Sequence, residues 1–517
     1  MSASQSSANK RRRTRSRYLG NVDIRREQTG IFGRKDSGQA SKWRARLQPW
    51  GLVFLVNIVI YVRRQLSSML ASPWFLALPL SLLLLSTSTD YLVLTHLLNA
   101  ADSLFYSDMP VPVEDDRREP AESLKKKVQA GIYLFAFALC LLNWREIVAY
   151  FRQWPHLLLL ILVLLCGVIY SIEPGKVITN SILILVSILV SMLFALGQPE
   201  ALRYQNFYMV VLVPLFGLHL ASFFLLFGYG VDIPGFLGSN QRYGGLLGNP
   251  NTLGGSAVLG MWAAGCLAFT RRASFRRKSF ALFSMLVFSF SIIISGSGTA
   301  LATVFILAAI LLWMRLLAAV STSVRSAMNT AIALLAVMTI LAVLIYTTPA
   351  KILLLVTESL GKDATLTGRT ELWGIARAAI AQHPWFGWGF DSHTSVKAVS
   401  EFDISFNHYH NGFLDTMVSG GVVLLSLVVY NLARFTREFS LAFRRDAAVF
   451  PMIMPLIILL LLNLSEYSLM RPLSEQWQIY VCAFVLLTWY GPAGNVRRTP
   501  RQASAKRRNN RKSLRWA

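Results

Sequence analysis

The sequence predicts an all-α membrane protein with about twelve transmembrane helices and one long loop between the ninth and the tenth. Only 15% of its 517 residues are charged and 54% are hydrophobic, whereas soluble domains carry roughly 25% charge. The mean hydropathy is +0.47. Apolar runs also recur along the chain, close to the ~20 residues that a helix needs to cross the ~30 Å hydrocarbon core.

The predicted spans follow from these apolar runs. The shorter run from Trp50 to Val62 is followed at once by Arg63 and Arg64, so we interpret it as interfacial. Lys and Arg crowd both tails, so both ends are expected in the cytoplasm, and the number of spans must be even. We place the spans near residues 73–89, 128–144, 156–171, 177–196, 207–228, 254–270, 279–297, 299–319, 330–348, 412–433, 449–465 and 476–491.

This topology divides the chain into five parts. The first 48 residues lack the apolar core of a signal peptide, and we expect a disordered basic arm there. The predicted parts are the basic cytoplasmic arm at 1–48, nine membrane helices at 49–348 with an outward loop at 229–253, the long outward loop at 349–411, three more helices at 412–491, and a basic cytoplasmic tail at 492–517.

The net charge of +25 is large, and a segment such as KRRRTRSR (10–17) alone would fit nucleic-acid binding. The placement of the charges favours the membrane instead. Basic residues cluster in two short loops, 271–278 and 434–445, that the topology places inside, while short loops on the other side hold single ones. We therefore expect contact with anionic membrane lipids and no nucleic-acid partner. The four cysteines fall inside spans, without the spacing of a disulfide or metal site.

The loop at 229–253 is rich in Gly and Asn, and GSNQRYGGLLGNPNTLGGS (238–256) leads into the sixth span. Asn251 is expected to cap that helix. A helix N-terminus beside Arg242 is suited to an anionic phosphate. An ordinary capped helix with a surface arginine fits the same residues, so the loop alone leaves both interpretations open.

The long loop holds four of the seven histidines. Within it, residues 370–381 have helical spacing of apolar side chains, which predicts an amphipathic helix on the membrane surface, with Arg369 at or just before its start. His410 and Asn411 immediately precede the tenth span and are expected at the outer membrane boundary. A histidine in a loop is more often solvated than catalytic, and HYH lacks a third zinc ligand. The proximity of two arginines and His410 to span ends on one side favours chemistry there.

Four segments occur in a fixed order, the last three around the long loop: GNPNTLGG, TLTGRTELW, HPWFGWGF and HYHNGFLD. Over residues 200–435 they resemble the O-antigen ligase and polymerase superfamily, and TLTGRTELW followed by HNGFLD looks most like its exopolysaccharide polymerase branch. The resemblance implies a GT-C-like glycosyltransferase of the bacterial inner membrane with an extracytoplasmic active site. It also implies a polyprenyl-diphosphate-linked oligosaccharide donor, a glycan, lipid or protein acceptor, and no cofactor.

The resemblance assigns roles to individual residues. The family's functional arginines map onto Arg242 and Arg369 and its histidine onto His410, which are therefore expected to be catalytic. Arginines offer permanently charged, bidentate donors to the diphosphate that leaves when a sugar hydroxyl attacks the anomeric carbon. The histidine can accept the hydroxyl proton or bond the phosphate, and the sequence leaves that choice open. Substrate contacts are expected from Asn249, Asn251, Asn411 and His408.

Two departures from the family pattern leave polymerase and ligase both open. Gly298 stands where many members have an arginine, and residues 420–425 read GGVVLL where Gly-x-x-Gly is common.

An alternative from another class is a transporter of polysaccharide or lipid-linked glycan. A transporter usually has two related halves and polar site residues inside its spans. We see no such repeat, and ionisable residues are almost absent from the spans.

Overall fold

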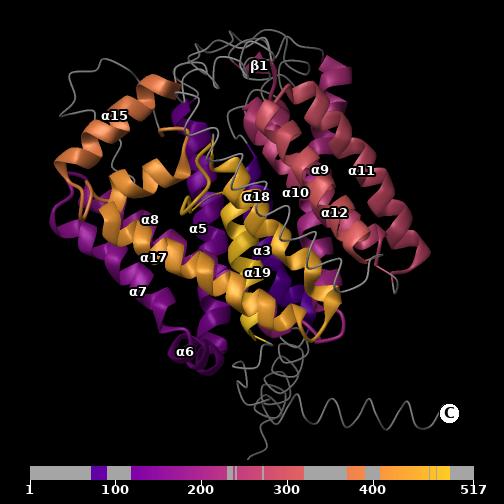
Figure 1. Cartoon of the computed structure of the whole chain (residues 1–517), viewed down its shortest axis with the longest axis horizontal. Helices are drawn as coiled ribbons and strands as arrows, with labels where there is room; N and C mark the ends of the chain where they lie inside the picture. Colours follow the sequence, from indigo (N-terminus) through magenta and orange to yellow (C-terminus); the bar gives the residue numbers. More distant parts are fainter. Residues whose placement is uncertain are drawn as a thin grey trace, which may run out of the picture. The chain divides into compact units, whose positions relative to one another are not determined.

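The computed structural model describes residues 72–89, 118–229, 237–238, 242–270, 273–318, 369–390, 408–464, 466–472 and 474–489 (Figure 1). All of these belong to the compact unit Ala71–Ala517. The predictions for residues 1–48, 50–62, 330–348 and 492–517 fall outside the described residues, as does most of the predicted long loop.

The described residues are almost entirely helical. The α-helices are α3 (Pro73–Ser88), α5 (Arg118–Leu142), α6 (Trp144–Gln153), α7 (Pro155–Cys166), α8 (Pro174–Gly197), α9 (Arg203–Tyr229), α10 (Pro250–Ala268), α11 (Phe275–Ser295), α12 (Gly298–Ala318), α15 (Arg369–Gln382), α17 (Gly412–Phe443), α18 (Met454–Leu462) and α19 (Glu475–Trp489). Short 3-10 helices are η2 (Gly167–Ile169), η3 (Gly245–Leu247) and η4 (Ala447–Ile453). Two short strands, β1 (Leu237–Gly238) and β2 (Arg242–Tyr243), pair antiparallel.

Every predicted span except 330–348 coincides with a helix, or with η4 and α18 in the case of 449–465. Within the described part of the chain, four helices are long and apolar enough to cross a membrane, or five if the sharply bent pair of α5 and α6 counts as one. Others, such as α7, are apolar but shorter. The structure is therefore that of an all-α membrane protein, while the count of twelve spans stays a prediction.

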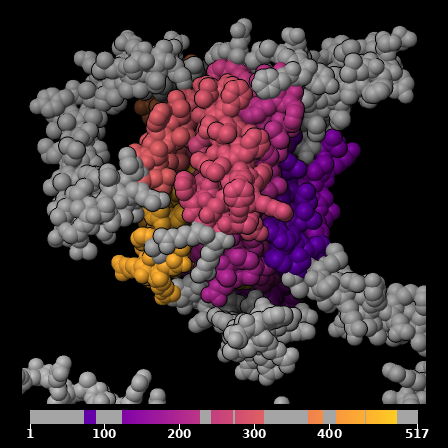
Figure 2. All heavy atoms as spheres, turned by 90° about the vertical axis from the view of Figure 1, so that its right-hand side faces the viewer, coloured from indigo at the N-terminus to yellow at the C-terminus, as the bar shows by residue number. Residues whose placement is uncertain are grey.

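Helix α10 packs against α9, α11 and α12, and Figure 2 looks onto the side of the molecule where this group lies. Gly260 lets the ring of Phe288 on α11 lie against α10, since an added Cβ would overlap that ring. His219 of α9 contacts the hydroxyls of Ser256 on α10 and Ser291 on α11, each at 2.7 Å. Close approach and interhelical hydrogen bonds hold helices together in lipid. The packed helices α9, α10 and α11 therefore support the loop that precedes α10.

Helix α17 is interrupted at Gly421, whose φ of 61° and ψ of −161° are not helical. Residues 383–390, the HPWFGWGF segment, dock into this break. Non-helical backbone within a span must find its hydrogen bonds in protein, and the docked segment provides them. From the docked segment, the backbone N–H groups of Trp388 and Gly389 donate to the carbonyls of Val418 (2.8 Å) and Ser419 (3.0 Å). From α17, the N–H group of Val422 donates to the Pro384 carbonyl (2.9 Å), and that of Val423 donates to the Trp385 carbonyl (3.2 Å).

The predicted helix at 370–381 is confirmed as α15, and Arg369 is its first residue. Its apolar side chains do not stay unpartnered. Ile375 and Ala379 are buried in a cluster with Tyr409 and Val418, so the apolar face of α15 lies against the start of α17. This packing joins the helix of the GRTELW motif to the HYHN segment.

Candidate functional site

Helix α10 begins with an asparagine cap, but at a different residue from the one predicted. The side chain of Asn249 accepts the backbone N–H groups of Asn251 (2.8 Å) and Thr252 (3.4 Å). The prediction that Asn251 caps the helix was therefore wrong. Pro250 favours the first helical position and holds the residue before it in the extended conformation that a cap requires. Asn251 is thus inside the first turn, where its amide is available for other contacts.

Arg242 is held beside the N-terminus of α10. Its Nε donates to the carbonyl of Ser295 at the end of α11 (3.0 Å), and its Nη2 donates to Oδ1 of Asn251 (3.0 Å). An added Cβ at Gly296 would be 3.3 Å from Nε, so the guanidinium also packs against the SGSGTA segment. These contacts fix the direction of the side chain and place its charge between two helix ends.

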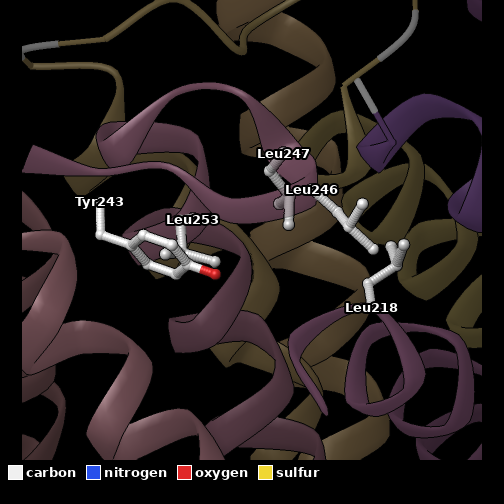
Figure 3. Close-up of a cluster of buried hydrophobic side chains, with 5 residues drawn as sticks. All are labelled: Leu218, Tyr243, Leu246, Leu247 and Leu253. Carbon is white, nitrogen blue, oxygen red and sulfur yellow. The ribbon is translucent and has the colours of Figure 1, made fainter. Parts of the chain in front are cut away.

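An apolar cluster anchors the strand that carries Arg242. Tyr243, Leu246, Leu247 and Leu253 pack with Leu218 of α9 (Figure 3). The Tyr243 hydroxyl donates to the carbonyl of Ser222, also on α9. Burial raises the pKa of the Tyr243 phenol, so it stays neutral and serves as an anchor. The loop before α10 is consequently shaped by apolar packing, which sets the position of the arginine.

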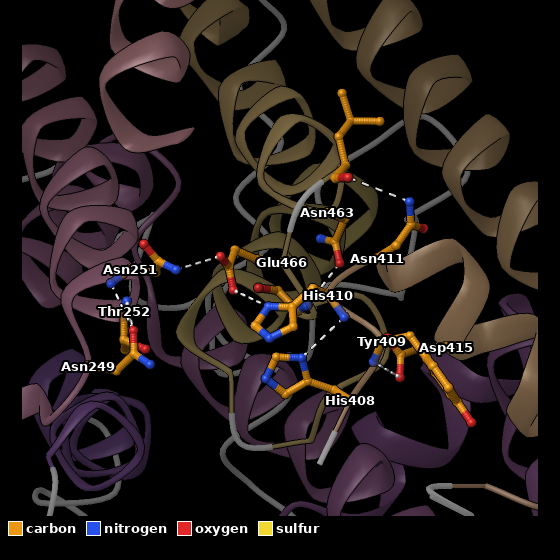
Figure 4. Close-up of polar contacts among 12 residues, drawn as sticks. Asn249, Asn251, Thr252, His408, Tyr409, His410, Asn411, Asp415, Asn463 and Glu466 are labelled. Atoms are coloured by element: carbon orange, nitrogen blue, oxygen red, sulfur yellow. Dashed lines mark hydrogen bonds and ion pairs between the residues drawn. The ribbon is translucent and has the colours of Figure 1, made fainter. Parts of the chain in front are cut away.

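Glu466 connects the two sides of the site (Figure 4). Its Oε1 accepts the Asn251 amide (2.9 Å), and its Oε2 lies 3.4 Å from Nδ1 of His410. Asn463 supports this residue, because its Oδ1 accepts the N–H groups of Ser468 (2.8 Å) and Leu469 (2.7 Å). The connection between α18 and α19 is thereby shaped into a turn that presents the carboxylate.

Sequence reasoning missed Glu466. One signal was present, because an acidic residue lies in the short connection after the apolar run 449–465. Ionisable residues inside membrane spans are rare and frequently functional, and Glu466 immediately follows the predicted span. Its partner Asn251 is 215 positions away in the chain, so nothing in the local sequence identified the contact.

His410 has a left-handed backbone, with φ of 49°. A non-glycine residue in this region is uncommon, and strained residues gather at functional sites. Its backbone N–H donates to Nδ1 of His408 (3.3 Å), and the two rings are 4.0 Å apart. When neutral, His408 therefore carries its proton on Nε2. The turn aims the His410 ring at Glu466, as Figure 4 shows.

Asn411 caps α17 and joins it to the neighbouring connection. Its Oδ1 accepts the N–H groups of Phe413 (3.0 Å) and Leu414 (3.1 Å), and its Nδ2 donates to the Leu464 carbonyl (3.5 Å). The Gly412 N–H donates to the Asn463 carbonyl (3.1 Å). Asn411 lies immediately before the helix, as predicted from the sequence, and its side chain has a structural role as the cap of α17.

Tyr409 ties this turn to α15. The indole Nε1 of Trp373 donates to the Tyr409 carbonyl (3.0 Å), and the buried carboxylate of Asp415 accepts the Tyr409 N–H (3.2 Å). Burial, reinforced by Asp415, raises the pKa of the Tyr409 phenol, which therefore stays neutral. Arg369 is one helical turn before Trp373. The structure describes it as the start of α15, and the position of its guanidinium falls outside the description.

The structure thus brings Arg242, Asn251 and His410 together through Glu466, and places His408 against His410. Asn249 and Asn411 serve as helix caps. Among the residues described, no group of three His, Cys, Asp or Glu side chains is arranged to hold a metal ion.

Residues 282–429 match a family model described as O-antigen ligase. The match includes α15, the docked HPWFGWGF segment and the turn at His410. Arg242, Asn251 and Glu466 are outside the matched range. No curated protein matches the chain significantly.

Proposed function

We propose, from the membership of the O-antigen ligase superfamily that this match supports, that the chain is a membrane glycosyltransferase. In this proposal the donor is a glycan linked to polyprenyl diphosphate, and the reaction takes place on the extracytoplasmic face. The acceptor is another lipid-linked repeat unit, so that the glycan grows. The sibling function is a ligase that attaches a finished glycan to a lipid or protein.

The observation that carries this proposal is the chain of contacts from Arg242 through Asn251 and Glu466 to His410. It joins a cation to an acid and a histidine. Transfer of a sugar is assisted by a cation, because negative charge develops on the leaving diphosphate, and by a base such as histidine, because the attacking hydroxyl loses a proton.

The reaction proceeds by attack of an acceptor hydroxyl on the anomeric carbon. A new glycosidic bond forms as the bond from that carbon to the diphosphate oxygen breaks, and the diphosphate leaves with the electron pair. Arg242 stabilises the charge on this leaving group. We assign Arg369 the same role, since α15 is anchored to the His410 turn through Trp373.

His410 takes the proton of the acceptor hydroxyl. With Nδ1 directed at Glu466, a neutral ring that keeps its proton on Nδ1 leaves Nε2 as the accepting atom. The 3.4 Å separation between Nδ1 and Oε2 is longer than a good hydrogen bond. Such contacts commonly tighten when substrate binds. Glu466 then holds the ring in place and stabilises the imidazolium that forms.

The decisive experiment incubates the purified full chain in lipid nanodiscs with a polyprenyl-diphosphate-linked oligosaccharide. Longer glycans and released polyprenyl diphosphate are expected with the wild type and not with His410→Ala. Arg242→Ala is expected to lose the activity as well. Arg145→Ala is its matched control for loss of an arginine, because Arg145 lies over the Trp144 ring on α6. Intact donor with unchanged chain length in the wild type would favour a transporter. Transfer of the glycan at unchanged length to an added lipid or protein acceptor would identify the ligase.

A further inference from the structure

A cluster of exposed apolar side chains lies where the docked HPWFGWGF segment meets the end of α7. Trp385 and Phe386 are 65% and 59% exposed, and Ile169 and Ile172 are 87% and 62% exposed. The Tyr170 hydroxyl donates to the Phe386 carbonyl (2.7 Å), so the two segments are side by side. These five residues, the apolar patch, are not needed for the proposed chemistry.

The patch continues a surface that is already suited to lipid. Helix α7 reads PHLLLLILVLLC, with no charged residue, and Leu158, Leu159 and Leu162 on it are exposed. The first charges beyond the patch are Glu173 and Lys176, which form an ion pair at 3.4 Å. The patch is therefore at the end of an apolar surface and immediately before a charged pair. In a membrane protein this position corresponds to the headgroup layer.

We propose that the apolar patch is an interfacial anchor whose partner is the lipid surface itself. Trp and Tyr are enriched at this depth because their rings are amphipathic. A sugar platform of exposed aromatic rings is the competing interpretation. The most exposed members of the patch are Ile169 and Trp385, and isoleucine offers no ring face to a sugar, so the composition favours lipid. This inference depends on the membrane assignment and is independent of the donor or acceptor.

The anchor has a mechanical consequence. The docked segment holds the break in α17 through backbone groups of Pro384, Trp385, Trp388 and Gly389. The exposed side chains of Trp385 and Phe386 are therefore free to contact lipid while their backbone stays bonded to α17. Insertion of the patch sets the depth of the break, and with it the depth of α15. The same arrangement makes the side chains replaceable without loss of the docking bonds.

Spin-label accessibility in proteoliposomes tests the anchor. A nitroxide is attached at Phe386→Cys or Ile172→Cys in a full chain whose four native cysteines are replaced by alanine. Both labels are expected to collide more often with oxygen than with a water-soluble nickel chelate, at a depth of ~5–10 Å into the headgroup and acyl boundary. Gln382→Cys, at the exposed polar end of α15, is the matched aqueous control. Equal chelate accessibility at 386 and 382 overturns the proposal, as does immobilisation of the 386 label by soluble glycan alone.

A second measurement keeps the native cysteines. Cys166 is exposed and lines a pocket with Tyr170 and Phe386. In proteoliposomes its reaction with a water-soluble maleimide is expected to be severalfold faster in the double variant Trp385→Asp, Phe386→Asp. The matched double variant Trp385→Leu, Phe386→Leu keeps the patch apolar and should react at the wild-type rate. Equal rates in the two double variants overturn the proposal.

Discussion

Two regions of this protein depart from regular helix, and they are stabilised in different ways. Around Glu466 the contacts are between side chains, from Arg242 to Asn251 and on to His410. At the break in α17 the contacts are between backbone groups, and glycines permit the approach. The first region depends on residue chemistry and the second on backbone shape. Substitutions that alter charge should therefore impair activity in the first region, and substitutions that add a Cβ should impair folding in the second.

The largest effect is expected from His410→Ala and Arg242→Ala. Loss of a group that stabilises transition-state charge, as proposed for Arg242, typically lowers the rate ~10²- to 10³-fold. Loss of a general base, as proposed for His410, typically lowers it ~10²- to 10⁴-fold. We expect these losses in the nanodisc transfer assay with a normally folded protein. Arg242→Lys keeps the charge but loses the planar, bidentate guanidinium, so its rate should lie between those of the wild type and Arg242→Ala. Full turnover in His410→Ala would show that His410 is not part of the active site. The region around Glu466 would then not depend on residue chemistry as proposed.

Gly421→Ala should destabilise the fold rather than slow the chemistry. The residue has φ of 61°, and an added Cβ would overlap the backbone of Trp385, so we expect a loss of ~1–3 kcal/mol in thermal unfolding. Gly217→Ala in α9 is the matched control, since nothing lies within 4 Å of its added Cβ. Alanine there should stabilise by ~0.5–1 kcal/mol. Equal melting temperatures in the two variants would show that the break tolerates a side chain.

Glu466→Gln tests whether the link between the two sides of the site acts through charge. Glutamine keeps an oxygen for the Asn251 amide but no longer presents a carboxylate to His410. A contact to a charged group is worth ~1.5–3 kcal/mol, so transfer should slow ~10-fold or more. Glu466→Ala should lose both contacts and slow further. If Glu466→Gln and the wild type turn over at equal rates, the negative charge of Glu466 is not needed, and its role is limited to positioning Asn251.

The smallest effect is expected from Trp373→Phe, which removes one hydrogen bond to the Tyr409 carbonyl while it keeps the aromatic ring. A neutral hydrogen bond contributes ~1 kcal/mol, and unfolding in detergent should report that loss. Trp388→Phe removes the bond to the Ala379 carbonyl (2.9 Å) and serves for comparison. A greater loss of transfer activity than of stability in Trp373→Phe alone would assign α15 a role in positioning His410.

The sequence predicted those features that depend on neighbours along the chain. The helix at 370–381 and the position of Arg369 at its start follow from the spacing of apolar residues. The placement of His410 and Asn411 immediately before the tenth span was also predicted. The exact cap of α10 was missed, because asparagines lie on both sides of Pro250. Only the preference of proline for the first helical position, with an extended residue before it, identifies Asn249 as the cap. The break in α17 was also missed, since GGVVLL is compatible with a continuous apolar helix.

The composition and apolar periodicity of this chain determined by themselves that it is an all-α membrane protein, and its ordered motifs determined its resemblance to the O-antigen ligases. The tertiary structure alone decided which residues meet. Asn251 reaches Glu466 across 215 positions, and the HPWFGWGF segment fills a gap in a helix that begins more than twenty residues later. Periodicity and propensity act within a few turns, whereas these contacts arise from the packing of distant helices, which no local pattern records.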